Sequence, residues 1–148
     1  MVNARFVRVE QGKERDFLPE LCQHIERWVE AGRRVVVLAA DRNAAGRMDE
    51  ALWTFSDAAF VPHSVLGSES SSLDRVLIAT PEAGVLRADV FVNFSREPVP
   101  AADWEEAPTH VDIWEFVKSF DPEARKESLR KWQRYRELGL QPVEAHLE

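Results

Sequence analysis

Cysteine and long hydrophobic runs are both scarce in this chain, and each scarcity excludes a class of protein. Cys22 is the single cysteine among 148 residues, so no disulfide can form within the chain. The N-terminal part has no apolar run long enough for a signal peptide or a transmembrane helix. We therefore expect a cytoplasmic protein that has no membrane partner.

Positive charge is also in short supply. The 19 lysine and arginine residues are outnumbered by 26 acidic residues, which gives a formal net charge of -7. Proteins that grip duplex DNA over their whole surface neutralise many phosphates with lysine and arginine. We expect any contact of this chain with DNA to be local or indirect.

The glycine-rich and nucleophilic motifs of common enzymes are missing too. Residues 39–44, which follow an apolar run, include no glycine that would let a pyrophosphate approach the backbone. No Gly-x-Ser-x-Gly motif accompanies His63, which we interpret as a structural or interface histidine. Cys22 and His24 are too few to bind zinc, and we expect Cys22 in the core and His24 in solvent. No catalytic, cofactor-binding or metal-binding residue is predicted, so we expect a non-catalytic protein.

The pattern of apolar residues predicts a single domain of the α/β class, spanning residues 1–148. The run from Val35 to Leu38 is unbroken, as in parallel strands that helices cover on both faces. Strands alternate with helices, which predicts a three-layer, Rossmann-like fold: a mostly parallel central sheet flanked by helices, without a nucleotide-binding glycine loop. We assign no role to residues 147–148, a pair typical of expression vectors. Strands are expected at 4–9, 34–39, 75–79, 89–94 and 111–117, the last nearer an edge, with helices from Asp16, from Asp41 or Asn43, and over 122–138, and one helical turn at 101–106.

The stretch at residues 48–66 joins a helix to an aromatic-rich turn. Met48, Leu52 and Phe55 lie at helical spacing and predict a core-facing stripe, which leaves Trp53 at its rim. Pro62 has no amide hydrogen to donate, so residues 60–63 should be an edge strand or a turn. Residue types alone leave open whether Trp53 and Phe60 fill the core or anchor a partner.

The predicted helix at 122–138 is the one basic segment of an acidic chain. Leu129, Trp132 and Tyr135 give it an apolar seam beside the basic side chains. A peptide that carries carboxylates and an aromatic end would fit such a surface. The alternative is a solvated face whose tryptophan and tyrosine belong to the core. The basic residues are Arg125, Lys126, Arg130, Lys131, Arg134 and Arg136.

Three blocks of this sequence resemble the chi subunit of bacterial DNA polymerase III. The first is Asp-Glu-Ala-Leu-Trp at 49–53, followed by Phe-Val-Pro-His at 60–63. The second, Val76 to Pro81, is similar to the family's following strand, which also ends in proline. The third, Tyr-Arg at 135–136 with Gly139, is similar to the close of its last helix. The order and near-equal spacing of these blocks carry the resemblance.

The resemblance implies a non-catalytic accessory subunit of the polymerase's clamp-loader complex. Such a subunit links that complex to the C-terminal tail of single-stranded-DNA-binding protein during DNA replication. Leu129 stands where a basic residue is usual in the family, and Trp132 where a tyrosine is usual. Arg130 and Arg134, one helical step away, are candidates to replace the lost charge. By alignment, the tail-binding positions are Val117, Arg125, Leu129 and Trp132.

The resemblance also implies a second surface, for the small partner subunit psi. Where psi is absent, the alternatives for the same surface are another clamp-loader component, a helicase or a second copy of this chain. Aromatic anchors of this kind concentrate binding energy at protein interfaces. The implied residues are Trp53, Phe60, Pro62, His63 and Leu66.

Two other functions stay open from the residues alone. A layered α/β fold also allows a nucleotide-binding enzyme that acts on a small phosphorylated molecule. Its anion site would lie at a helix N-terminus near residues 41–45. A direct single-stranded-DNA binder is the other alternative, in which bases stack on Trp132 and Tyr135 beside the basic residues.

Overall fold

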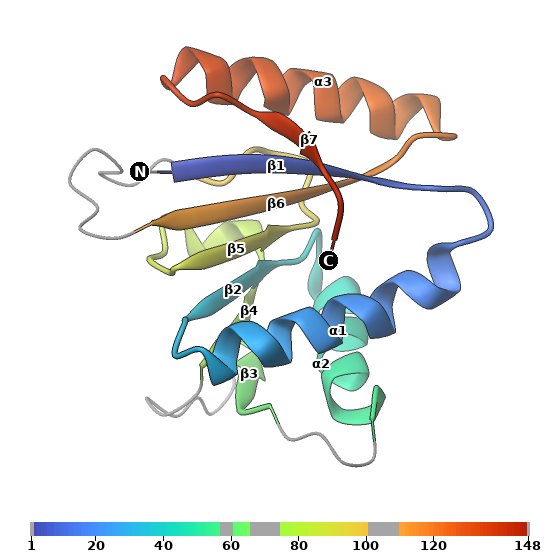
Figure 1. Ribbon diagram of the computed structural model, residues 1–148, viewed down its shortest axis with the longest axis vertical. Coiled ribbons are helices and arrows are strands. Elements are labelled where there is room, and N and C mark those ends of the chain that lie inside the picture. Colours follow the sequence, from blue (N-terminus) through green and yellow to red (C-terminus); the bar gives the residue numbers. More distant parts are fainter. Residues whose placement is uncertain (1, 57–60, 66–74, 101–109, 148) are drawn as a thin grey trace.

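The computed structural model describes residues 2–56, 61–65, 75–100 and 110–147, and a seven-stranded sheet forms the centre of this part (Figure 1). The helices are α1 (Glu14–Glu30), α2 (Arg42–Thr54) and α3 (Pro122–Glu137), with a short 3-10 helix η1 (Pro81–Ala83). The strands are β1 (Val2–Val9), β2 (Val35–Leu38), β3 (His63–Val65), β4 (Val76–Ala79), β5 (Val90–Asn93), β6 (Val111–Lys118) and β7 (Val143–Ala145). Neighbouring strands are parallel throughout the order β3-β4-β2-β5-β6-β1-β7. The helical turn predicted at 101–106 lies outside the described residues.

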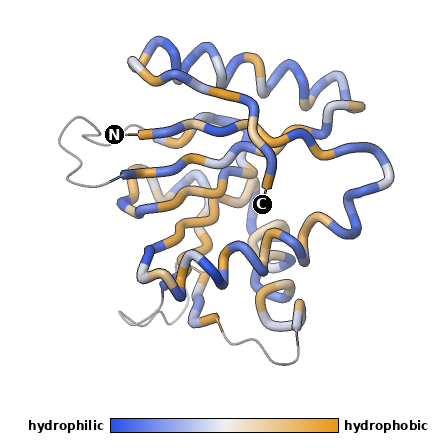
Figure 2. The backbone as a smooth tube through the Cα atoms, in the orientation of Figure 1, coloured by the Kyte–Doolittle hydropathy of each residue, from blue (hydrophilic) through white to orange (hydrophobic). Residues whose placement is uncertain are grey.

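Helices cover both faces of this sheet, which confirms the predicted three-layer α/β fold. Helices α1 and α2 lie on one face, and α3 lies on the other (Figure 1). In β2, Val35 and Val37 belong to the core cluster that α1 and α2 share. The intervening Val36 belongs to the cluster that contains Tyr135 of α3. Strands β2 and β5 in the middle of the sheet are buried on both faces, so β2 is apolar throughout and β5 is apolar except at Asn93 (Figure 2).

Capping side chains fix where two of the helices begin. The Asp41 carboxylate accepts a hydrogen bond from the Ala44 amide at 2.8 Å and so caps α2. Asp121 caps α3 in the same way, and Pro122 occupies the first helical position, where no amide hydrogen is needed. Both starts agree with the prediction, because capping is a local property of the sequence.

Strand β6 has neighbours on both sides, so the prediction that it lies nearer an edge is wrong. It pairs with β5 on one side and with β1 on the other. Its alternating pattern has another cause. Ile113 and Glu115 are fully buried on the α3 face, whereas Trp114 and Phe116 on the opposite face are only half covered. The short strand β7 pairs with β1 and forms this edge of the sheet. It was not predicted from the sequence.

Helix α1 begins at Glu14, two residues before the predicted start. Cys22 is completely buried, as predicted. The expectation that His24 faces solvent is wrong, because only 6% of it is exposed and its ring lies 6.1 Å from the ring of Trp28. Burial lowers the pKa of His24, so the neutral imidazole is favoured.

None of the helices described is both long and apolar enough to cross a membrane.

Candidate functional site

A groove of about 740 Å³ lies beside α3, between this helix and strands β1, β6 and β7. We call it the α3 groove. Four residues predicted to bind the tail line it together: Val117 at the end of β6, and Arg125, Leu129 and Trp132 from successive turns of α3. Their spacing along the helix and the position of α3 over the sheet bring them to one place. The other lining residues are Phe6, Val7, Arg8, Glu10, Ser119, Ser128, Glu144, Ala145 and His146.

Aromatic rings form the floor of the α3 groove. The ring of Phe6, from β1, lies 5.0 Å from the ring of Trp132. Phe6 also meets Tyr135 edge to face at 6.1 Å. Phe6 and Tyr135 are buried, Trp132 is half-buried, and Leu129 at the rim is 60% exposed. The groove therefore presents apolar surface that an incoming hydrophobic side chain can cover.

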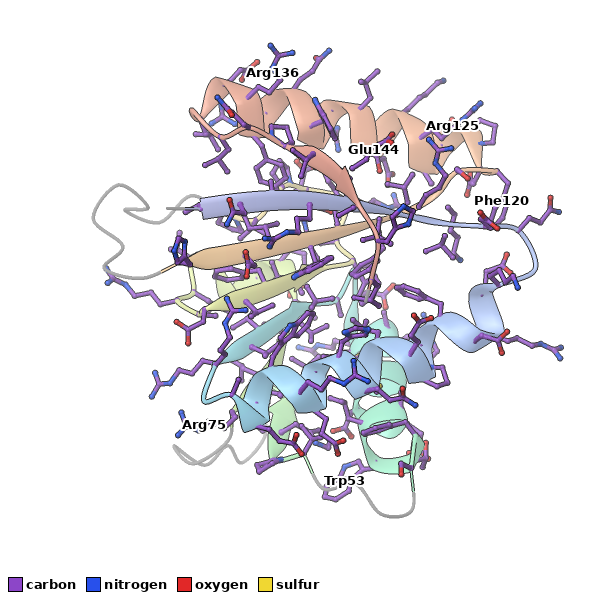
Figure 3. All side chains as sticks on the ribbon, viewed as in Figure 1. Trp53, Arg75, Phe120, Arg125, Arg136 and Glu144 are labelled. Carbon is purple, nitrogen blue, oxygen red and sulfur yellow. The ribbon has the colours of Figure 1, made fainter. Side chains whose placement is uncertain are left out.

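The charges around the α3 groove are mixed. Arg125 is exposed and has no ion-pair partner among the residues described. Arg8, from β1, is paired with Glu144 of β7 at 3.4 Å. Figure 3 shows Arg125 and Glu144 toward the α3 end of the molecule. An unpaired arginine beside an apolar slot is a suitable receptor for a peptide carboxylate.

Arg130 and Arg134 do not line the α3 groove. They were the candidates to replace the positive charge that is missing at Leu129. The guanidinium of Arg130 donates to the Arg96 carbonyl at 3.0 Å and to the Glu97 carboxylate at 3.2 Å. Arg134 pairs with Glu137 at 3.1 Å. Both arginines are engaged outside the groove, so the structure brings together four of the six predicted tail-binding residues.

A buried polar network holds α3 against the sheet, and its members do not line the α3 groove. The carboxylate of Glu115, on β6, accepts hydrogen bonds from Lys131 Nζ at 2.9 Å, Tyr135 Oη at 2.6 Å and Asn93 Nδ2 at 2.7 Å. The Tyr135 hydroxyl in turn accepts a bond from the Val99 amide at 2.8 Å. Burial raises the pKa of Glu115, while Lys131 and the hydrogen bonds oppose that rise. Burial also raises the pKa of Tyr135, so its hydroxyl keeps its proton and donates it to the carboxylate.

Sequence reasoning missed this network. It counted Lys131 with the basic face of the helix and Tyr135 with its apolar seam. A signal was present in the alternation of β6, since Glu115 takes the position where Val111 and Ile113 predict another buried side chain. Glutamate is almost never fully buried unless it is paired, so a buried cation was to be expected nearby.

The surface predicted for psi lies at the opposite end of the molecule, where Trp53 projects from the end of α2 (Figure 3). Trp53 is 57% exposed and its ring lies 4.8 Å from that of His63, so it does not fill the core. His63 Nδ1 contacts the Val61 carbonyl at 2.6 Å, and its Nε2 lies 3.1 Å from Asp49 Oδ1 without hydrogen-bond geometry. Pro62 directly precedes edge strand β3. The predicted residues Phe60 and Leu66 lie outside the described residues.

The nucleotide alternative finds little support at the carboxyl ends of the strands. The chain leaves β2 and β5 in opposite directions, and a crevice of about 450 Å³ lies there, where open α/β sheets commonly bind ligands. At the start of α2, however, the Asp41 carboxylate already occupies the anion position and would repel a phosphate. Asn93 and Ser95 on the crevice floor are hydrogen-bonded within the protein. In the described ranges, no three metal-ligating side chains form a cluster.

The structure also weakens the alternative of direct single-stranded-DNA binding. That prediction placed bases on Trp132 and Tyr135. Tyr135 is completely buried, and its hydroxyl is bonded to Glu115 and to the Val99 amide. A base cannot stack on a ring that is enclosed on all sides, so only Trp132 of the two remains accessible.

Comparison with known proteins identifies the family. Residues 1–143 match the family model described as DNA polymerase III chi subunit, HolC. The chain belongs to the DNA polymerase III chi subunit family. The curated protein DNA polymerase III subunit chi of Escherichia coli (strain K12) is 28% identical to it over 146 residues, which cover 95% of each chain. Membership of the chi family gives the chain an accessory role in DNA replication, as part of the DNA polymerase III complex.

Solved structures similar to this chi-family chain show its fold alone. The C-terminal domain of the DEAD-box protein Dbp5 matches with a TM-score of 0.62 and 14% identity, covering 97% of this chain and 90% of that chain. The XPD helicase matches with a TM-score of 0.51 and 12% identity, covering 97% of this chain and 35% of that chain. At such identity, likeness of fold carries no information about function.

Proposed function

We propose that this chain is a non-catalytic subunit that tethers the clamp-loader complex to single-stranded-DNA-binding protein. The α3 groove binds the acidic C-terminal tail of that protein, whose last residue is hydrophobic and bears the terminal carboxylate. The observation that carries this proposal is the convergence of Val117, Arg125, Leu129 and Trp132 on one groove.

The groove supplies both things that such a tail needs. The terminal side chain covers the apolar surface of Trp132 and Leu129, above the ring of Phe6. Arg125, which has no ion-pair partner within the described residues, attracts the tail's carboxylates. The site is small and open, so we expect a micromolar dissociation constant, about -8 kcal/mol. Binding weakens as salt rises, since the charges involved are exposed.

Fluorescence anisotropy of a labelled acidic peptide with a hydrophobic C-terminal residue tests this proposal. Arg125→Glu reverses the attraction, and Trp132→Ala removes the apolar slot, so each should abolish measurable binding. Leu129→Glu is a further variant that cannot fail by unfolding a core, because Leu129 is mostly exposed. Its loss of binding would come from the added negative charge and the lost apolar contact.

The matched control is Arg136→Glu, which makes the same charge change near the far end of α3, away from the groove (Figure 3). It should bind the peptide nearly as the unmodified chain does. Equal weakening by Arg125→Glu and Arg136→Glu would indicate general attraction to a basic helix and would overturn the groove as the binding site. Unchanged binding by Leu129→Glu and Trp132→Ala would do the same.

A second contact, to psi or another clamp-loader component, is proposed at the exposed Trp53 with Pro62 and His63 beside it. Trp53 is a large aromatic side chain that the domain leaves mostly in solvent, and such residues commonly anchor protein interfaces. Phe60 and Leu66 belong to this proposal on the resemblance alone. The two surfaces lie at opposite ends of the molecule, so one chain can hold both partners at once (Figure 3).

A further inference from the structure

The α3 groove contains a second arginine, and a carboxylate of the protein already holds it. Arg8 of β1 and Glu144 of β7 both line the groove, and Arg8 Nη2 lies 3.4 Å from Glu144 Oε1. Their side chains are 65% and 78% exposed, so both solvent and a ligand can reach them. This pair is the feature of the groove that tail recognition, as argued above, leaves unused.

We propose that Arg8 binds the terminal carboxylate of the tail, and that Glu144 is an internal competitor that occupies Arg8 in the free protein. Arg8 is then a residue that selects a free C-terminus over an internal peptide segment. This inference rests on the proposed function of the groove and assigns a second cation to it.

The register of the sheet places Arg8 where the carboxylate must go. Arg8 follows Phe6 by two residues on β1, so both side chains point to the face that α3 covers. Residues two apart on a strand lie roughly 7 Å from each other. This is about the distance between the bound side chain of a terminal residue and the protein group that binds the carboxylate of the same residue. A hydrophobic residue resting over Phe6 and Trp132 therefore has its carboxylate near Arg8.

Glu144 reaches Arg8 because β7 pairs with β1 in parallel register. Glu144 is the register partner of Phe6, so its side chain lies on the same face of the sheet. Exposed ion pairs contribute little free energy, because solvent screens both charges. A ligand carboxylate can thus displace Glu144 at low cost, whereas Arg125, across the groove, needs no such displacement.

The test compares two labelled peptides, identical except that one has a free C-terminal carboxylate and the other a C-terminal amide. Arg8→Gln should weaken binding of the free-acid peptide about fivefold, equivalent to about 1 kcal/mol, and leave binding of the amide peptide unchanged. Glu144→Gln should strengthen binding of the free-acid peptide about two- to threefold, because the competing carboxylate is gone. The variant Arg8→Gln with Glu144→Gln should bind the free acid as weakly as Arg8→Gln alone.

Matched controls come from the Arg134–Glu137 pair, which is similarly exposed, 3.1 Å apart and outside the groove. Arg134→Gln and Glu137→Gln change the net charge identically but should leave both peptides' affinities unchanged. If Arg8→Gln acts no more strongly than Arg134→Gln while Leu129→Glu abolishes binding, the inference is wrong and the proposed function stands. If Glu144→Gln acts as Glu137→Gln does, Glu144 is not a competitor. Failure of the unmodified chain to bind the free acid overturns both proposals.

Discussion

Replacing Lys131 by methionine removes the cation that pairs with the buried carboxylate of Glu115, and the result should be a large, pH-dependent loss of stability. Lys131 Nζ lies 2.9 Å from that carboxylate, and the two side chains are 7% and 1% exposed. Breaking a buried ion pair by removing one partner commonly costs about 3 to 5 kcal/mol. Tyr135 and Asn93 still donate to Glu115 in the variant, so we expect about 3 kcal/mol, the lower end of this range.

The pH dependence follows from the direction of the pKa shift. Burial raises the pKa of Glu115 above its value in the unfolded chain, so the folded state holds the proton more tightly. Stability from such a group is present below the unfolded pKa and is lost as pH rises through the folded pKa. Without Lys131 the folded pKa of Glu115 rises further. The destabilisation by Lys131→Met should therefore be large at about pH 7.5 and smaller at about pH 5.

Urea denaturation followed by tryptophan fluorescence at both pH values measures this difference. Lys126→Met is the matched control, because Lys126 lies on the same helix with 78% of its side chain exposed, 3.8 Å from the equally exposed Glu123. It should change the free energy of unfolding by less than about 0.5 kcal/mol at either pH. Adding Glu115→Gln to Lys131→Met should restore part of the loss. A pH-independent loss, or one no larger than that of Lys126→Met, would show that Lys131 does not offset the buried charge of Glu115.

Two further predictions concern the two surfaces. Leu129→Lys adds a cation at the rim of the α3 groove and should tighten peptide binding about two- to fivefold at low salt, which anisotropy measures; unchanged or weaker binding would argue that Leu129 lies away from the carboxylates. Trp53→Ala should abolish binding to purified psi, or to another clamp-loader component, in a pull-down while changing the midpoint of thermal unfolding little, because Trp53 is mostly exposed. Retained partner binding would remove Trp53 from that interface, and a large loss of stability would show that it supports the fold.

Much of the fold was predictable because its signals are local. The stripe of Met48 and Leu52, the caps at Asp41 and Asp121, and the unbroken run of β2 each depend on a few neighbouring residues. The position of β6 was not predictable in this way. Its alternation reflects how helices cover its two faces, and strand order is set by contacts between distant segments.

In the candidate site too, some residues could be predicted from the sequence and others depend on contacts between distant segments. Val117, Arg125, Leu129 and Trp132 were found by alignment, and α3 and the end of β6 bring them together. Arg8 was not found, because it lies 136 positions from its partner Glu144, and only the pairing of β7 with β1 joins them. The role of Lys131 was missed for a similar reason. Helical periodicity gives its face, but nothing local indicates that Glu115 lies opposite.

The proposed binding of the single-stranded-DNA-binding protein's tail in the α3 groove can be measured with whole proteins. The measurement is isothermal titration of this chain with the native single-stranded-DNA-binding protein, full-length and lacking its last few residues. We expect saturable micromolar binding to the full-length protein, loss of that binding on truncation, and loss with Leu129→Glu against the full-length protein. Equal binding to the full-length and truncated proteins would contradict this proposal.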